Sequence, residues 1–227
     1  IVHLHWVGDF LDWESFFSKN KKPVLWSLYD LNSLTGGCHY TGDCQAFRDD
    51  VGCLCCPQLP RGQKSLAAAC NLRLKKLALK SRRSSILYAP ASQWLAEQLS
   101  FSPMCRTLDQ ILLPHLSDEG IYFPVSKQSA RSELGLASIG RLLLFVGDTR
   151  NYRKGYDLLE AAITQFSGQW NFLIIGNGDN VSAAENVQVI GQVNDPEILR
   201  LSYNAADAVV IPSREDNLPL TMIDSQM

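Results

Sequence analysis

The sequence has almost no net charge, because 21 Lys and Arg residues stand against 23 Asp and Glu residues, a formal balance of −2 at pH 7. A protein that bound nucleic acid across its surface would need a basic excess, so this class of partner is not expected. Long apolar runs are also lacking, since runs such as LLLFV at 142–146 are far too short to cross a bilayer. With 46% hydrophobic residues among 227, the chain can still bury a core.

Cysteine is rare outside one segment, where five of the seven lie between residues 38 and 56. An odd count without signs of secretion favours reduced thiols or metal ligands over a disulfide framework. Four thiolates ending in a C-x2-C pair suit a tetrahedral structural Zn²⁺. Reduced, partly buried thiols are the alternative, and we expect His39 to make only local contacts.

Short apolar runs alternate with helical patterns along the chain. Strands are predicted at 1–7, 24–29, 85–90, 110–114, 141–147, 171–176, 187–191 and 207–212. Helices are predicted at 65–80, 91–99, 126–135, 155–166, 195–206 and from 219 onward. Strands this apolar, separated by amphipathic helices, predict parallel sheets covered on both faces, with ligands at the carboxyl ends of the strands.

The predicted helix at 65–80 carries an apolar stripe formed by Leu66, Cys70, Leu74 and Leu77. Basic residues are frequent between Arg73 and Arg83. Such a helix can touch acidic lipid or an anionic acceptor, although a solvated surface is the alternative.

Three strand ends in the second half carry residues that suit a diphosphate ligand. Glycines let the backbone approach a ligand closely, and helix starts favour anions. These glycines are Gly147, Gly176 and Gly178. Arg150, Arg153 and Lys154 precede a predicted helix start. A plain turn and solvated cations are the alternative for each feature taken alone.

The segments FVG…RKG, IIGNG and AADAVVIPS and the pair Asp216-x7-Asp224 occur in this order. Together they resemble the donor-binding domain of retaining family-4 glycosyltransferases with the GT-B fold, over about residues 110–227. The resemblance implies that Lys154 contacts the donor diphosphate and that Asp216, or Glu215 beside it, lies near the sugar. It implies that Asp224 accepts hydrogen bonds from the ribose hydroxyls. The other implied donor contacts are Gly147, Arg150, Arg153, Gly176, Gly178, Asn217 and Leu218.

Residues 26–62 contain LYDLNSLTGGCHY and end in CLCCPQLPRG. They are similar to a cysteine-bearing insertion in a bacterial subgroup of that family, many of whose members act on exopolysaccharide or lipopolysaccharide sugars. Cys38, Cys44, Cys53 and Cys56 match this insertion, with Cys55 as an extra, and are therefore the four candidate zinc ligands. The resemblance also implies that Asp30 orients substrate hydroxyls. Tyr29 stands where the subgroup has His, and His3 or His5 is an alternative cleft residue.

We therefore expect an α/β, GT-B-like protein with two Rossmann-like domains. Residues 1–118 would form an incomplete acceptor-side domain with a Cys-rich insertion at 35–63, and residues 119–227 the donor domain. The chain begins IVHLHW without Met and without the family's Gly-rich loop, so we expect a piece of a longer protein.

The expected reaction is sugar transfer from a nucleotide-diphosphate sugar to a glycan or lipid-linked acceptor, with Lys154, Asp216 and Asp30 as catalytic candidates. We expect no obligatory cofactor, a structural zinc ion as the metal candidate, and no nucleic-acid partner. The expected location is the cytoplasm, with peripheral contact at the inner face of the membrane. The alternatives are a GT-B sugar-nucleotide epimerase and a non-enzymatic zinc-binding module.

Overall fold

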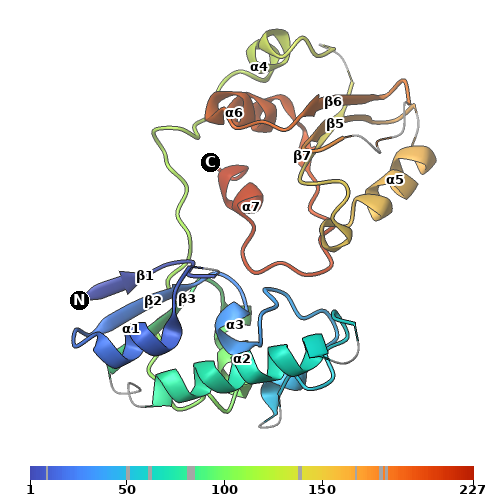
Figure 1. The fold of residues 1–227 in the computed structure, drawn as a ribbon. Coiled ribbons are helices and arrows are strands. Elements are labelled where there is room, and N and C mark those ends of the chain that lie inside the picture. Colours follow the sequence, from blue (N-terminus) through green and yellow to red (C-terminus); the bar gives the residue numbers. More distant parts are fainter. Residues whose placement is uncertain are drawn as a thin grey trace. The chain divides into compact units, whose positions relative to one another are not determined.

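The computed structural model describes residues 1–8, 10–49, 52–60, 63–80, 85–137, 140–166, 168–178, 181 and 184–227. The chain divides into two compact units, Ile1–Pro114 and His115–Met227, a division that falls just before the predicted one after residue 118. Each unit contains one parallel sheet (Figure 1). Among the described residues, no helix is both long enough and apolar enough to span a membrane.

The first unit has three strands in the order β1 (Val2–Leu4), β2 (Val24–Leu28) and β3 (Ile86–Pro90). Its helices are α1 (Trp13–Lys19), α2 (Gln63–Lys80) and α3 (Gln93–Phe101), with 3-10 turns η1 (Asn32–Leu34) and η2 (Ala46–Arg48). Trp26 and Tyr88 stack in its core with ring centroids 5.8 Å apart. Such aromatic pairs bury a large apolar area in a small domain.

Two sequence predictions for the first unit were wrong. The segment 110–114 is not a strand, because it forms only an isolated bridge between Gln110 and Tyr88 and one further backbone hydrogen bond to β3, from Leu113 to Pro90. Helix α1 was not predicted, since it is short; Asp12 caps it by accepting a hydrogen bond from the backbone N–H of Ser15.

Helix α2 turns its predicted apolar stripe away from the core. Leu72 and Leu79 are buried in the core of the first unit, and Lys75 is buried beside them. Leu66 and Leu74 of the predicted stripe are instead exposed. The helix therefore has leucines on two faces, and only one of these faces packs against the rest of the unit.

The second unit has four strands in the order β6 (Val187–Gly191), β5 (Asn171–Ile175), β4 (Leu142–Val146) and β7 (Ala208–Val209). Its helices are α4 (Lys127–Glu133), α5 (Tyr156–Gln165), α6 (Pro196–Ala205) and α7 (Leu220–Asp224), with the 3-10 turn η4 (Tyr152–Lys154). Leu144 packs in a cluster with residues of α4 and α6, whereas Phe145 packs with residues of α5. Since successive strand residues face opposite sides, the sheet is covered on both faces, as predicted (Figure 1).

A network of ion pairs and hydrogen bonds surrounds Asp207 at the amino end of β7. Arg131 donates from Nη2 to Asp207 Oδ2 at 2.8 Å and from Nε to the carbonyl of Ala205 at 2.9 Å. The same carboxylate oxygen accepts the backbone N–H of Leu142 at 2.8 Å. The hydrogen bond from Lys127 holds the pKa of Asp207 below its ordinary value, and the Leu142 N–H adds to this effect. The aspartate of the AADAVVIPS segment therefore ties β7, β4 and α4 together.

Candidate functional site

The carboxyl ends of β4 and β5 meet at glycines. Gly176 has φ 142°, and a Cβ there would overlap the carbonyl oxygen of Gly147. A Cβ on Gly178 would lie 2.6 Å from a methyl group of Val189. These glycines thus let segments of the protein's own backbone lie close together. Their predicted contact with a ligand stays a prediction.

The segment after β7 packs against the turn η4 that follows β4. Gly155 has φ 71°, and a Cβ there would overlap the carbonyl oxygen of Pro212. The backbone N–H of Arg214 donates to the carbonyl of Arg153 at 2.8 Å. This close approach of two backbones brings the cations of η4 to the acids after β7.

One carboxylate holds both cations of η4. Lys154 Nζ lies 2.7 Å from Asp216 Oδ2, and Arg153 Nη1 lies 3.3 Å from Asp216 Oδ1. Arg153 Nη1 also donates to the carbonyl of Glu215 at 2.8 Å, and Ser213 Oγ donates to Asp216 Oδ2 at 3.2 Å. The structure thus brings together three of the residues predicted for donor binding. The two cations and the one carboxylate have a net charge of +1, which suits an anionic ligand.

Two opposing effects act on the ionisation of Asp216. Burial raises the pKa of this carboxyl, but the hydrogen bond and charge of Lys154 and the charge of Arg153 outweigh burial. The pKa of Asp216 is therefore below its ordinary value, and the group is a carboxylate at neutral pH. An ionised carboxylate can only accept hydrogen bonds, so it suits sugar hydroxyls as well as cations.

Arg214 was missed by the sequence reasoning. Its guanidinium donates to both carboxylate oxygens of Asp157 at 2.7 Å and lies 3.9 Å from the ring centroid of Tyr152. These contacts fasten the segment after β7 to the start of α5. No local pattern marks this pair, because its partners are 57 residues apart in the sequence.

The remaining predicted donor residues lie around this cluster with different partners. Arg150 is exposed, and its Nε lies 3.5 Å from Asp148 Oδ1. Glu215 provides its backbone carbonyl to Arg153, and Asp216 provides its side-chain carboxylate. Asn217 and Leu218 are half-buried in the loop that leads to α7.

Asp224 has partners of its own. Ser117 Oγ donates to Asp224 Oδ1 at 2.8 Å. Asp224 also lines a cavity of about 100 Å³ with Tyr122, Arg200 and Tyr203. Burial raises the pKa of Tyr203 to about 12, and the charge of Asp224 acts in the same direction. The structure therefore places Asp224 beside polar and aromatic groups that suit hydroxyl-bearing ligands.

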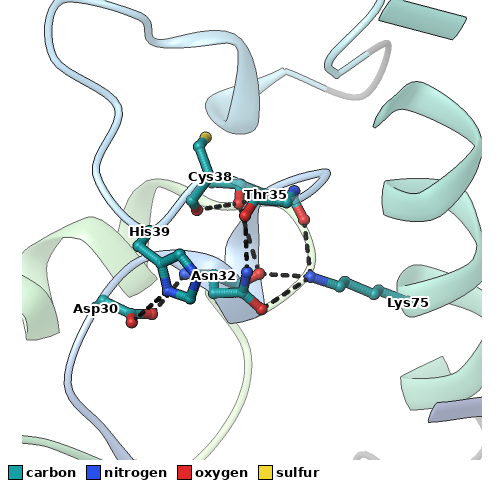
Figure 2. Close-up of polar contacts among 7 residues, drawn as sticks. Asp30, Asn32, Thr35, Cys38, His39 and Lys75 are labelled. Carbon is teal, nitrogen blue, oxygen red and sulfur yellow. Dashed lines mark hydrogen bonds and ion pairs between the residues drawn. The ribbon is translucent and has the colours of Figure 1, made fainter. Parts of the chain in front are cut away.

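A second group of polar residues follows β2 in the first unit (Figure 2). Asp30 Oδ2 lies 2.6 Å from His39 Nδ1, and Asp30 Oδ1 accepts the backbone N–H of Asn32 at 2.8 Å. The buried ammonium of Lys75 donates to the carbonyl of Asn32 at 2.7 Å and to that of Thr35 at 3.2 Å. Lys75 therefore anchors the turn that carries Asp30.

His39 makes a more specific contact than the sequence predicted. Because an ionised carboxylate can only accept hydrogen bonds, Asp30 places the proton of a neutral His39 on Nδ1 and leaves a lone pair on Nε2. Trp6 stacks on the imidazole with centroids 5.8 Å apart. His5 Nδ1 lies 2.6 Å from the Tyr29 hydroxyl. The carboxyl ends of β1 and β2 thus carry aromatic rings and hydroxyl-binding groups.

His3, the other alternative cleft residue, has a different environment. Its Nε2 lies 2.9 Å from Ser27 Oγ within the sheet. For His39, the TGGCHY segment was the only signal in the sequence, and this segment did not indicate the contact between His39 and Asp30.

The four predicted zinc ligands are not arranged as a metal centre. Among the described residues, which include all four, no group of three or more His, Cys, Asp or Glu side chains is placed to hold a metal ion. Cys38, Cys53 and Cys56 line a cavity of about 330 Å³, whereas the N–H of Cys44 closes a turn onto the carbonyl of Thr41. Burial raises the pKa of Cys38 and of Cys53, and the nearby Cys44 and Cys56 act in the same direction. Zinc stays a prediction from the sequence.

Residues 140–227, from β4 to α7, match the sequence model of the family described as "Glycosyl transferases group 1". The match lies within the second unit and covers less than half of the chain. A D-inositol 3-phosphate glycosyltransferase of Segniliparus rotundus is 29% identical over 132 residues, which cover 51% of this chain and 29% of that protein.

Two solved structures show the same fold as this chain. Sucrose-phosphate synthase from Thermosynechococcus elongatus matches with a TM-score of 0.68 and 18% identity, over 98% of this chain and 52% of that one. Anabaena HepE in complex with UDP and glucose matches with a TM-score of 0.55 and 13% identity, over 90% of this chain and 50% of that one. The predicted GT-B fold is confirmed. The chain spans about half the length of these structures.

Proposed function

We propose that this chain is part of a retaining family-4 glycosyltransferase. It transfers a hexosyl or related sugar from a nucleotide-diphosphate sugar to a glycan or lipid-linked acceptor, in the synthesis of a cell-surface polysaccharide. The observation that carries the proposal is the cluster of Lys154, Arg153 and Asp216 at the carboxyl end of the second sheet. The group 1 domain match and a similar structure in complex with UDP and glucose support a nucleotide-sugar donor.

The two cations of η4 are the diphosphate-binding groups in this proposal. Charge develops on the diphosphate as the bond to the sugar breaks, and fixed cations in a partly buried site stabilise that charge. Asp216 holds Lys154 and Arg153 in place before the donor binds. Because the cations are already ordered, less conformational entropy is lost when the diphosphate arrives.

The other carboxylates bind hydroxyl groups in this proposal. Asp224 accepts hydrogen bonds from the ribose, in a cavity that also contains the hydroxyl-bearing Tyr203. Asp30 orients the acceptor through His39, whose Nε2 accepts a hydrogen bond from a sugar hydroxyl. The aromatic ring of Trp6 beside His39 offers an apolar surface of the kind on which a pyranose ring packs.

Calorimetry with UDP-, GDP- and dTDP-sugars on the full-length protein tests the proposal. We expect one class of donor to bind, and Lys154→Gln to weaken that binding about tenfold or more, because a charge-assisted hydrogen bond to phosphate is lost. Arg141→Gln is the matched control, since Arg141 precedes β4 at the opposite end of the strand and contacts Trp170. Failure of all three donor classes to bind would contradict the proposal.

A further inference from the structure

The outward face of α2 combines exposed leucines with a strong local excess of positive charge. Leu66, Cys70, Leu74 and Leu77 form this outer stripe, and the three leucines are 57%, 52% and 57% exposed. At about 100° per residue, the four side chains fall within an arc of roughly 80°. A continuous apolar row on a helix surface differs from the scattered exposed leucines of ordinary surfaces.

The inward face of the same helix packs against the core of the first unit and donates hydrogen bonds to it. Leu72 and Leu79 belong to the core of the first unit, and Lys75 donates to the carbonyls of Asn32 and Thr35. The helix cannot roll to bury its outer stripe without removing these contacts. Exposure of the outer stripe is therefore a consequence of how α2 is held.

Cations border the outer stripe along one side. Arg73 and Lys80 are exposed and lie next to the leucines on the helix surface, and Lys76 follows them. The sequence from Arg61 to Arg83 contains eight Lys and Arg residues and no Asp or Glu, in a chain whose overall charge is −2. Of these eight, Arg73, Lys76 and Lys80 border the outer stripe in the described part of the helix, whereas Lys75 is buried on the inward face.

We propose that the outer stripe of α2 docks on an anionic lipid surface. Leucines would enter the boundary between headgroups and acyl chains, while the lysine and arginine heads reach the phosphates. A polybasic segment on such a helix is attracted by anionic leaflets. The occupant is a membrane rather than a second copy of this chain, because a two-fold contact through α2 would bring two sets of these cations together.

Co-sedimentation of the full-length protein with vesicles tests the proposal. One set of vesicles contains equal parts of phosphatidylglycerol and phosphatidylcholine, and the other contains phosphatidylcholine alone. We expect binding to the anionic vesicles that falls as salt is added. The double variant Leu74→Ser/Leu77→Ser is expected to bind about tenfold more weakly or worse, with an unchanged melting temperature.

Matched variants separate the contributions of the leucines and the cations. Leu116→Ser/Leu158→Ser removes two exposed leucines of the second unit and should leave vesicle binding unchanged. Arg73→Glu/Lys80→Glu should weaken binding about tenfold. Lys21→Glu/Lys22→Glu makes the same change of net charge at exposed positions of the first unit and should have little effect.

Three results would overturn the proposal. The first is absence of binding to anionic vesicles. The second is a leucine double variant that binds anionic vesicles as tightly as the parent protein, together with binding of an oligonucleotide by the parent with similar affinity. This result would indicate adhesion to any polyanion. The third is a leucine double variant that melts earlier or changes oligomeric state, which indicates that protein covers the outer stripe.

Discussion

The two ends of β7 carry the same set of charges in different surroundings. At the amino end, Asp207 pairs with Lys127 and with Arg131, whose side chain is 6% exposed. At the carboxyl end, Asp216 pairs with Lys154 and Arg153, whose side chains are 26% and 24% exposed. Charge chemistry alone therefore does not distinguish a structural ion pair from a binding site.

Arg131 at the amino end is more deeply buried than Arg153 at the carboxyl end, although both also donate to backbone carbonyls. Arg131 donates to the carbonyls of Ala205 and Gly140 as well as to Asp207, so its guanidinium is enclosed by the unit's own polypeptide. Lys154 has an ammonium with three donors, and Asp216 takes one of them at a partly exposed position. We infer that the amino end supports the fold and that the carboxyl end is available to a ligand.

The largest expected effect on stability is at the amino end. Asp207→Asn keeps the shape of the side chain but leaves the buried Arg131 without its counter-ion, which we expect to lower the free energy of unfolding by about 2 kcal/mol. Urea unfolding followed by circular dichroism measures this change. Donor affinity of the folded protein should not change, and an equal loss of affinity and stability would show that the two ends are not separable.

A smaller effect on stability and a larger effect on function are expected at the carboxyl end. Asp216→Asn should lower stability by less than about 1 kcal/mol, because its partners are partly solvated. It should bind UDP or another nucleoside diphosphate at least as tightly as the parent, since the carboxylate that competes for Lys154 is gone. Sugar transfer should fall about 100-fold, the usual order for one lost transition-state contact.

Calorimetry with the diphosphate and a transfer assay with the sugar nucleotide make these two measurements. A loss of diphosphate affinity in Asp216→Asn would contradict the expectation that removing the competing carboxylate outweighs the loss of its ordering effect on the cations. It would instead show that Asp216 is needed to position Lys154.

Apolar runs predicted parallel sheets covered by helices, and strand-end residues pointed to Arg153 and Lys154, whereas the GT-B fold and Asp216 were predicted from the family resemblance. Parallel strands bring their carboxyl ends to one edge of a sheet, so local motifs far apart in the sequence can be combined correctly. The resemblance placed Lys154 and Asp216 near the same ligand, but their direct contact, across 62 residues of sequence, was not predicted.

Long-range polar partners without a motif were not predictable. Arg131 and Asp207 are 76 residues apart, and nothing in their local sequences indicates a pair. The orientation of α2 was missed for the same reason, because the sequence offered leucines on two faces. The carbonyls of Asn32 and Thr35 that accept hydrogen bonds from Lys75 lie about 40 residues upstream, and these contacts helped to determine which face is buried.

The smallest expected effect concerns how the stability contributions of Asp207 and Asp216, at the two ends of β7, depend on pH. The pKa values of Asp207 and Asp216 are both below their ordinary values, mainly through the hydrogen bond from Lys127 for Asp207 and through Lys154 acting against burial for Asp216. A depressed pKa adds stability that is complete above the unfolded-state pKa of about 3.9 and is lost as pH falls through the lower, folded-state pKa. The stability difference between the parent and Asp207→Asn should therefore be constant from neutral pH to about pH 5 and shrink below about pH 4. The corresponding difference for Asp216→Asn should follow the same course with a smaller amplitude. A difference for either variant that grows as pH falls would contradict the direction of its pKa shift.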